Sequence, residues 1–206
     1  MEPKWLEWAR SLQAISQNGL MYAVNEYDIE RYNQIKDIAA KMMSSNSDGD
    51  FKYIKDLFDN VEGYATPKVD VRGVRFQDKK ILLVKEKEDG AWALPGGWAD
   101  PNETPSESIE REVFEESGFV VKAKKILALY DRTKQGHTPL FPFHVYKIFF
   151  LCTLIGGKKA LSNETEDVDF FEEDNIPELS HSRVSLTQIK RFFEHYRDST
   201  LQTDFD

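Results

Sequence analysis

Apolar residues near the start of the chain recur at three- and four-residue steps, the spacing that places side chains on one face of an α-helix. This first stripe consists of Trp5, Trp8, Leu12 and Ile15. Asn18-Gly19 interrupts the pattern, so we expect the first helix to end there.

Two further helices are expected before the pattern changes to that of β-strands. Asp28 can cap the first of them, whose apolar stripe is Ile29, Tyr32, Ile35, Ala39 and Met42. The apolar residues of the second are Phe51, Ile54, Leu57, Phe58 and Val61. A polar connection, Ser44 to Gly49, separates the two, and Gly63 to Pro67 marks a boundary. Short amphipathic helices bury little surface alone, so these must pack on the rest of the chain or on a second copy of it.

From Val69 onwards the pattern changes to that of β-strands. Val69 to Arg72 alternates, and its apolar phase shifts at Gly73, which predicts a β-bulge. Further strands are expected at Ile81–Val84, Ala91–Leu94, Val120–Asp131, His144–Ile155 and Val168–Phe171, followed by a helix at Val184–Tyr196. This order predicts an α+β protein with a small N-terminal helical domain, residues 1–65, and a mixed-sheet domain, residues 66–206.

Charge and cysteine content narrow the classes of function. With 27 basic and 36 acidic residues the net charge is −9, so neither a nucleic acid nor an anionic membrane is the expected partner. The longest apolar stretch, Ile148 to Ile155, is too short to span a bilayer. Cys152 stands alone among apolar neighbours, which predicts an inert core thiol and a reducing, cytoplasmic environment.

The segment from Thr104 to Gly118 carries several independent signals of a short helix. Thr104 and Glu107 form the pattern of a capping box, and Pro105 suits the first helical position. Ile109 and Val113 are four residues apart and should face the core. Gly118 fits the left-handed residue that ends a helix.

Three carboxylates should crowd one side of this helix. At about 100° per residue, Glu112, Glu115 and Glu116 fall within an arc of roughly 100°. The arc adjoins the apolar stripe, so Glu116 should be partly buried. Like charges so close repel each other, and a divalent cation such as Mg²⁺ or Mn²⁺ would offset that cost. The alternative is a solvated acidic face without a ligand.

The preceding loop, Leu94 to Trp98, supports the interpretation that a divalent cation binds at these carboxylates. Its two glycines let the backbone approach a ligand closely, so a carbonyl oxygen such as that of Gly96 could complete the ligand set of a metal ion. Glu103 lies eight residues before Arg111, and an ion pair between them would hold the loop on the helix. We interpret that pair as structural.

These residues together resemble the Nudix box, G-x5-E-x7-R-E-U-x-E-E-x-G-U, in which U is a bulky aliphatic residue. The matching positions are Gly97, Glu103, Arg111, Glu112, Val113, Glu115, Glu116 and Gly118. Phe119 departs from the pattern, because an aliphatic residue is usual there; the change should alter packing and leave metal binding intact. The resemblance implies a Nudix α/β/α sandwich with a mixed β-sheet, preceded by the helical domain.

The first ~65 residues resemble a helical extension found on one Nudix subgroup, whose members are commonly described as ADP-ribose or CDP-choline pyrophosphatases. An apolar stripe on such an extension packs either on its own domain or on a partner, and we expect it to form a homodimer.

For the site, the resemblance implies Mg²⁺ held by Glu112, Glu115, Glu116 and the Gly96 carbonyl, with Mn²⁺ as a substitute. The metal would neutralise the diphosphate and activate a water. The general base would come from the box, as Glu112, or from the acidic loop before Val168, as Glu166 with Glu164 as the alternative. A solvated acidic turn is an equally good reading of that loop.

Substrate contacts are harder to assign. Arg72, Glu86 and Tyr130 would line the cleft if the sheet is arranged as in the family, although each could equally be a surface or core residue. Trp92, Trp98 and Tyr130 could cage a choline cation. His137, His181 and His195 are isolated in the sequence and show no zinc-ligand spacing.

The sequence therefore predicts a hydrolase that cuts the diphosphate of a nucleoside diphosphate linked to a group X. ADP-ribose, cleaved to AMP and ribose 5-phosphate, is the preferred substrate, and CDP-choline is the alternative. A Nudix-fold ligand sensor is a third hypothesis, which the intact box and the acidic charge disfavour.

Overall fold

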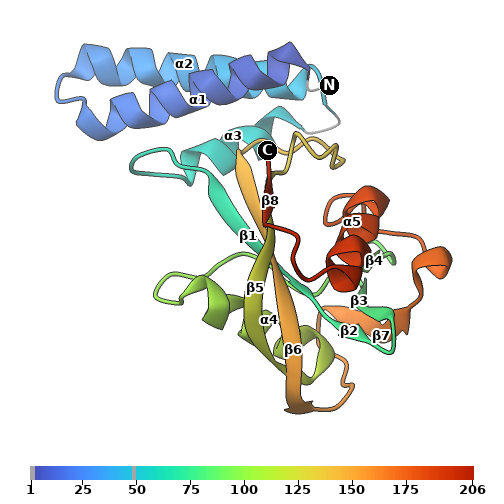
Figure 1. Ribbon diagram of the computed structural model, residues 1–206. Coiled ribbons are helices and arrows are strands. Elements are labelled where there is room, and N and C mark those ends of the chain that lie inside the picture. Colours follow the sequence, from blue (N-terminus) through green and yellow to red (C-terminus); the bar gives the residue numbers. More distant parts are fainter. Residues whose placement is uncertain (1–2, 48–49) are drawn as a thin grey trace. The chain divides into compact units, whose positions relative to one another are not determined.

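The computed structural model of the protein describes residues 3–47 and 50–206. The chain divides into two compact units: residues 1–67 with 140–144, and residues 68–139 with 145–206. Each unit has its own hydrophobic core. Figure 1 labels the helices and strands of both units.

The first unit is built on three helices. These are α1 (Lys4–Tyr22), α2 (Glu26–Ser44) and α3 (Phe51–Asp59). Its core contains Leu6, Ala9, Ala39, Ala40, Met43, Ile54 and Phe58. The segment Leu140–His144 belongs to this unit as well, since Phe143 packs edge-on against Phe58 with ring centroids 5.8 Å apart.

Helix α1 differs from the expectation in two ways. It continues through Asn18-Gly19 to Tyr22. Gly19 is needed there because a Cβ on it would lie 2.2 Å from Cε1 of Tyr32, so the glycine lets α1 and α2 approach closely. The predicted apolar stripe is buried only in part: Trp5 and Leu12 pack against the core beside the buried Leu6 and Ala9, whereas Trp8 and Ile15 are exposed.

The expectations for helix α2 and for the connection that follows it need smaller corrections. Helix α2 begins earlier than predicted, because Asn25 is the N-cap and its side chain accepts a hydrogen bond from the Asp28 N–H at 2.8 Å. Part of the connection expected at Ser44 to Gly49 lies outside the described residues.

The second unit contains two four-stranded sheets, and its strands and helices have the following bounds. The first sheet has the order β1-β6-β5-β8, from β1 (Lys68–Val74), β6 (Val145–Gly157), β5 (Phe119–Asp131) and β8 (Asp204–Phe205). The second contains β2 (Phe76–Gln77), β3 (Lys80–Glu86), β4 (Trp92–Ala93) and β7 (Thr165–Phe171). The helices are α4 (Pro105–Ser117) and α5 (Leu186–Arg197), with a short 3-10 turn, η1 (Glu173–Asn175).

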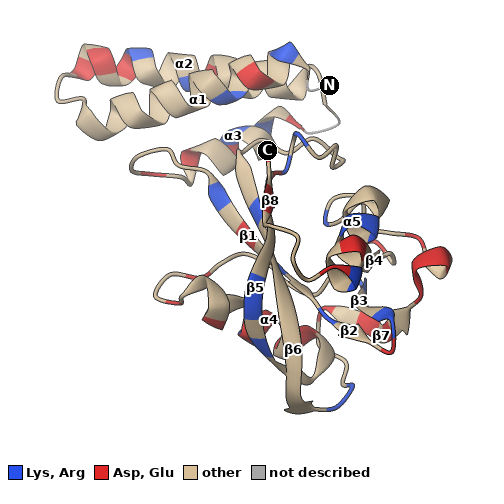
Figure 2. Ribbon diagram, in the orientation of Figure 1, with Lys and Arg blue, Asp and Glu red and all other residues tan. Residues whose placement is uncertain are grey.

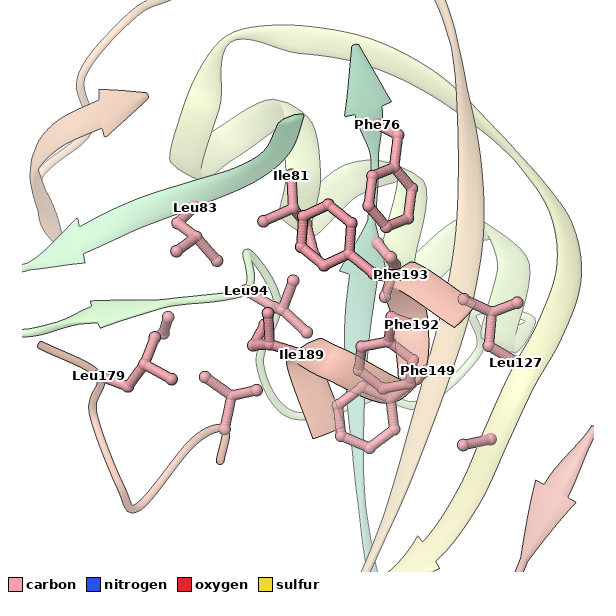
Figure 3. Packing of buried hydrophobic residues seen from close by; sticks show 14 residues of the cluster. Phe76, Ile81, Leu83, Leu94, Leu127, Phe149, Leu179, Ile189, Phe192 and Phe193 are labelled. Carbon is pink, nitrogen blue, oxygen red and sulfur yellow. The ribbon is translucent and has the colours of Figure 1, made fainter. Parts of the chain in front are cut away.

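Two cores give this unit its layers. One core lies between the sheets and α5, and Figure 3 shows Phe149, Phe192 and Phe193 converging there with Leu94 and Ile81. The other core lies beneath α4, which packs against β1 and β5. The arrangement is the expected α/β/α sandwich with mixed strands, since β1 runs parallel to β6 and β5 antiparallel to it.

The bulge predicted at Gly73 is wrong, because the pairing of β1 with β6 runs without a break from Lys68 to Val74. Both faces of β1 are covered, so the apolar phase can change without a bulge. Gly73 instead permits a close approach of α4, since a Cβ there would lie 2.5 Å from Cγ2 of Val113. The strand expected at Val168 begins earlier, at Thr165.

Two expectations outside the site concern the single cysteine and the absence of a membrane-spanning segment. Cys152 is buried and free, and burial raises the pKa of its thiol to about 12, as expected of an inert core residue. None of the described helices is both long and apolar enough to cross a membrane.

Candidate active site

Capping residues fix where the acidic helix α4 begins and ends. Thr104 and Glu107 form the predicted capping box, in which the Thr104 N–H donates to Glu107 Oε2 at 2.9 Å. Gly118 ends the helix with φ 76°, the left-handed conformation that favours glycine. Ile109 and Val113 are fully buried, so their packing in the core fixes the direction of the adjoining acidic side of α4. Figure 2 shows acidic residues along this helix.

Glu116 is the most buried carboxylate of this helix, with 5% of its surface exposed. Its Oε2 accepts a hydrogen bond of 2.8 Å from the N–H of Gly96. Burial raises the pKa of Glu116 to about 8, and the charges of Glu86 and Glu112 act in the same direction, although Arg72 opposes them. A carboxylate in this position is stabilised by any cation that reaches it.

Arg111 draws the other acidic residues of the box to itself. It donates to both oxygens of Glu103, at 2.8 and 3.1 Å, which is the ion pair expected from the spacing. Its Nη1 donates to Glu112 and to Glu115, each at 2.9 Å. Glu112 is largely buried, and burial raises the pKa of its carboxyl group, whereas the Glu115 side chain is exposed.

The three carboxylates expected on one patch are therefore divided between two partners, the Gly96 N–H and Arg111. Within residues 3–47 and 50–206, no three acidic, histidine or cysteine side chains converge closely enough to hold a metal ion. Their chemistry nevertheless fits a hard cation, because they supply carboxylate oxygens, and two of the three, Glu112 and Glu116, are largely buried. Gly97 also leaves the space beside the Glu112 carboxylate open on the side of the loop. A Cβ on residue 97 would lie 3.0 Å from Oε2 of Glu112.

The loop that carries Gly96 and Gly97 is fastened to β1. The N–H of Val71 donates to the Gly97 carbonyl and that of Gly73 to the Pro95 carbonyl, both at 2.8 Å. Gly96 has φ +140°, and a Cβ there would lie 2.1 Å from the carbonyl oxygen of Val71. Only glycine fits both the backbone conformation and the space.

Arg72 and Glu86 are buried side chains within electrostatic reach of Glu116. Arg72 donates two hydrogen bonds to Asp70 and one to the Leu94 carbonyl. Glu86 pairs with Arg183 at 3.1 Å, but this contact lacks hydrogen-bond geometry, so its Oε1 has no hydrogen-bond donor among the described residues. Burial raises the pKa of Glu86.

The two loop candidates for a general base, Glu166 and Glu164, have different neighbours. Glu166 is part of β7, and its carboxylate forms an ion pair with Lys85, the neighbour of Glu86 on β3. Successive strand residues point to opposite faces, so Lys85 and Glu86 diverge. Glu164 lies just before β7 and is close enough to Glu86 to raise its pKa.

The aromatic and histidine candidates lie elsewhere. Tyr130 packs edge-on against Phe149, and its hydroxyl donates to Asp204 at 3.4 Å. Trp92 packs against Phe171, whereas Trp98 is exposed. His137 and His195, which are isolated in the sequence, have partners that the fold brings to them.

Both of these histidines are buried and have partners. Nδ1 of His137 lies 3.0 Å from the His181 carbonyl, and Nε2 of His195 lies 2.9 Å from Asp204. Burial lowers the pKa of His137 to about 4.

Sequence reasoning missed Asp70, Lys147 and Arg183 as neighbours of the candidate site. Lys147 carried a signal, because it is a lone charge within the apolar and aromatic run of residues 145–152. A charge inside such a strand is costly unless it has a partner, so it could have been singled out.

A mixed-sheet sandwich with a buried acidic helix beside a glycine loop is the arrangement expected of a Nudix hydrolase. The chain belongs to the Nudix family: the profile of the NUDIX domain matches residues 66–192. Within the family, residues 3–58 match the domain described as "UDP-X-like, N-terminal oligomerisation domain". The expected family and enzyme class are thus confirmed.

Similar proteins agree with this assignment. The protein YjhB of Bacillus subtilis, provisionally named an ADP-ribose pyrophosphatase, is 40% identical over 206 residues, which is 100% of this chain and 99% of that protein. An ADP-ribose pyrophosphatase of Methanocaldococcus jannaschii is 37% identical over 60% of this chain and 72% of its own.

Two solved structures are also similar. One, of an ADP-ribose pyrophosphatase from Streptococcus suis, has a TM-score of 0.63 at 38% identity and covers 68% of this chain and 100% of its own. Another, of a UDP-X diphosphatase, has a TM-score of 0.64 at 30% identity and covers 98% of both chains.

The geometry predicts that lysine cannot replace Arg111. One guanidinium bonds four carboxylates, those of Asp100, Glu103, Glu112 and Glu115, and a lysine ammonium cannot reproduce its planar fork. We expect Arg111→Lys to lower kcat/KM by about 10–100-fold and the free energy of unfolding by about 1–2 kcal/mol. Steady-state kinetics and urea unfolding test this. Lys122→Arg, an exposed substitution on β5, is the control, and equal activity of both variants would contradict the prediction.

Proposed function

We propose that this Nudix hydrolase cleaves the diphosphate of a nucleoside diphosphate linked to X in the presence of Mg²⁺, with ADP-ribose as the preferred substrate. The observation that carries the proposal is Glu116, a buried carboxylate with a raised pKa beside a glycine loop that leaves Glu112 uncovered. A buried acid of this kind is a stable part of the fold when a cation shares its site.

Glu112, Glu115 and Glu116, together with the Gly96 carbonyl, are the residues that would hold the metal, and Mn²⁺ could replace Mg²⁺. A bound divalent ion there supplies charge neutralisation of the phosphate oxygens and a more acidic water. The chain's own contribution is orientation: Arg111 and Glu103 hold the helix against the loop, and the Gly96 N–H directs Glu116. Nudix hydrolases generally use divalent metals, which supports this reading.

ADP-ribose is favoured because two relatives and one solved structure carry that substrate in their names. A UDP-linked substrate is the second candidate, because the N-terminal domain description and one solved structure that covers almost the whole chain name UDP-X. CDP-choline stays a prediction of the sequence, and Tyr130, one of its proposed cage residues, packs against Phe149.

The deciding experiment is a substrate panel of ADP-ribose, UDP-glucose, CDP-choline and an oxidised nucleoside triphosphate. Each is incubated with Mg²⁺, with Mn²⁺ or with EDTA, and phosphate release is measured after phosphatase treatment. We expect ADP-ribose to have the highest kcat/KM and no turnover in EDTA. Faster cleavage of UDP-glucose would transfer the proposal to a UDP-linked substrate, and turnover that persists in EDTA would exclude the metal-dependent reaction.

The general base is proposed among Glu112, Glu164 and Glu166. Of the two loop candidates, Glu164 is the better placed, since Glu166 pairs with Lys85 while Glu164 acts on Glu86. We expect Glu164→Gln to lower kcat by about 100-fold with KM nearly unchanged, and Glu166→Gln to change kcat less than threefold. Kinetics of both variants as a function of pH test this. The reverse ranking would return the role to Glu166, and no effect of either would leave Glu112.

We further propose that the N-terminal helical domain, residues 1–65, forms a homodimer. Trp8, Ile15 and Tyr22 are seven residues apart on α1 and are 56%, 55% and 67% exposed. Seven residues are nearly two helical turns, so they form one exposed apolar stripe. The description of the matching domain as an oligomerisation domain supports the proposal.

Substitution of this stripe should change the oligomeric state. We expect Trp8→Glu to convert a dimer into a monomer at micromolar concentration, because a charge would be buried without a partner. Light scattering coupled to size exclusion measures this, and Glu30→Ala on α2 is the control. A wild-type monomer, or a dimeric Trp8→Glu variant, would contradict it.

A further inference from the structure

Trp98 is an aromatic residue beside the glycine loop of the candidate active site, and 48% of its surface is exposed. Its backbone is paired with β1 in an antiparallel bridge opposite Asp70. The flanking residues make the hydrogen bonds of this bridge, since the Ala99 N–H donates to the Val69 carbonyl at 3.0 Å and the Gly97 carbonyl accepts from β1 as well. The strand therefore holds this tryptophan in place, although its ring reaches the surface.

The bridge also fixes the direction of the Trp98 side chain. Asp70 and Trp98 form a pair of the kind without direct hydrogen bonds, in which the Cα atoms lie about 4.5 Å apart and both side chains stand on one face. Arg72, two residues further along β1, shares that face. Arg72 lies within electrostatic reach of Glu112 and Glu116. The indole therefore stands on the face from which a charged side chain reaches the box carboxylates.

The loop keeps Trp98 close to the proposed metal site. Gly96, whose N–H donates to Glu116 at 2.8 Å, lies two residues before Trp98, which is at most about 7 Å along the chain. Gly97, between them, is open towards the Glu112 carboxylate. In a nucleoside diphosphate the ribose separates the base from the first phosphate by a comparable length. A diphosphate bound at the box would thus bring its base within reach of Trp98.

The other two aromatic residues considered for the substrate contact different rings. Trp92 packs edge-on against Phe171, with ring centroids 4.7 Å apart, and Tyr130 packs against Phe149 at 6.0 Å. A quaternary ammonium is recognised by several rings that surround it. A single flat ring suits stacking, which tolerates different bases because every base has a π-face. The arrangement around Trp98 therefore favours a nucleobase over a choline cation.

We propose that the indole of Trp98 is the surface on which the nucleobase of the substrate stacks. The inference rests on the proposed function for the position of the diphosphate, and it adds that the base is bound by its flat face. The two substrate candidates, ADP-ribose and a UDP-linked compound, carry different bases, and a stacking surface accepts both. The base then contributes affinity, and selection between substrates comes mainly from the group X.

The test compares two diphosphate mimics that cannot be cleaved at the bridging position, one with a base and one without. α,β-Methylene-ADP and methylene diphosphonate are titrated by calorimetry into the full-length protein with Mg²⁺. We expect Trp98→Ala to weaken the binding of methylene-ADP by about tenfold or more and to leave that of methylene diphosphonate unchanged. Trp98→Phe should retain most of the affinity for methylene-ADP, because its ring can still stack.

Phe114→Ala is the matched control. Phe114 is an exposed aromatic residue of the same helix as the box carboxylates, and a rotation of about 200° about the helix axis separates it from Glu112. This variant should bind both mimics like wild type. Equal affinity of wild type and Trp98→Ala for methylene-ADP, or no binding of it to wild type, would overturn the proposal. An equal loss for methylene diphosphonate would also overturn it, because Trp98 would then only hold the loop.

Kinetics separate this proposal from the proposed function. With ADP-ribose, Trp98→Ala should raise KM about tenfold and change kcat by less than about threefold, because stacking is uniform binding. If no nucleotide of the substrate panel is cleaved but the binding of methylene-ADP still depends on Trp98, the stacking surface is supported and the proposed function fails. If ADP-ribose is cleaved with the same KM by Trp98→Ala, the proposed function is supported and the stacking surface fails.

Discussion

Glu116→Gln should abolish Mg²⁺-dependent turnover, by on the order of a thousandfold or more, while the protein still folds. The amide retains an oxygen that can accept the Gly96 N–H, so the loop contact survives the substitution. What is lost is the negative charge that would hold the metal. Kinetics with saturating Mg²⁺, and calorimetric titration of Mg²⁺ into the protein, measure the two parts of this result.

The same substitution should make the metal-free protein more stable at alkaline pH. The folded state holds the proton of Glu116 up to a pKa of about 8, whereas the ordinary pKa of an exposed glutamate is 4.5. Between these values the folded state binds more protons than the unfolded state, so the free energy of unfolding falls as pH rises and the loss is complete above pH 8. We expect a loss of about 3–5 kcal/mol in wild type, and glutamine removes this contribution.

Urea unfolding in EDTA at pH 6 and pH 9 tests the stability prediction. Glu110→Gln on the same helix is the matched control, since its oxygen can still accept the Ala123 N–H and the residue pairs with Lys122 away from the box. Addition of Mg²⁺ should restore the stability of wild type at pH 9 but leave Glu116→Gln unchanged. Wild-type turnover in Glu116→Gln, or equal pH profiles, would remove Glu116 from the metal site.

Gly96→Ala should destabilise the protein by about 4 kcal/mol or more and eliminate activity. A methyl group there would lie 2.1 Å from the Val71 carbonyl and 2.9 Å from Cα of Arg72, and both contacts are to backbone that cannot rotate away. The φ of +140° adds strain for any residue with a side chain. The loop would have to leave β1, which would break the contact of the Gly96 N–H with Glu116.

Gly90→Ala separates strain from collision. Gly90 also has a positive φ, +68°, but a Cβ there would meet nothing within 4 Å. We expect a cost of about 1 kcal/mol and near wild-type activity. Thermal unfolding and steady-state kinetics of the two variants give the comparison, and similar losses in both would show that the close approach at Gly96 is unimportant.

Helix α4, which carries the acidic residues of the site, could be predicted from the sequence because its signals are local. The capping box of Thr104, the stripe of Ile109 and Val113 and the left-handed Gly118 act within a few residues of each other, so they can be read in order along the chain. The pair of Glu103 with Arg111 was predictable for the same reason.

The face of a helix that is buried was less predictable. Trp8 and Ile15 have the spacing of a core stripe, yet the neighbouring Leu6 and Ala9 pack inside the unit. Both faces of α1 are apolar enough to be buried, and periodicity does not say which one meets α2. The close approach at Gly19 decides that, because it depends on Tyr32 of the second helix.

By itself the sequence determined the family, the helix α4 and the types of residue at the site, because each depends on near neighbours. Only the tertiary structure decided that Glu116 is bonded to the Gly96 N–H, that Glu166 faces Lys85, and that Asp70 is shared by Arg72 and Lys147. These partners are distant in sequence and meet only when the strands pair and the loop closes on β1. Burial and charge balance, which set the pKa of each group, arise at that stage and not before.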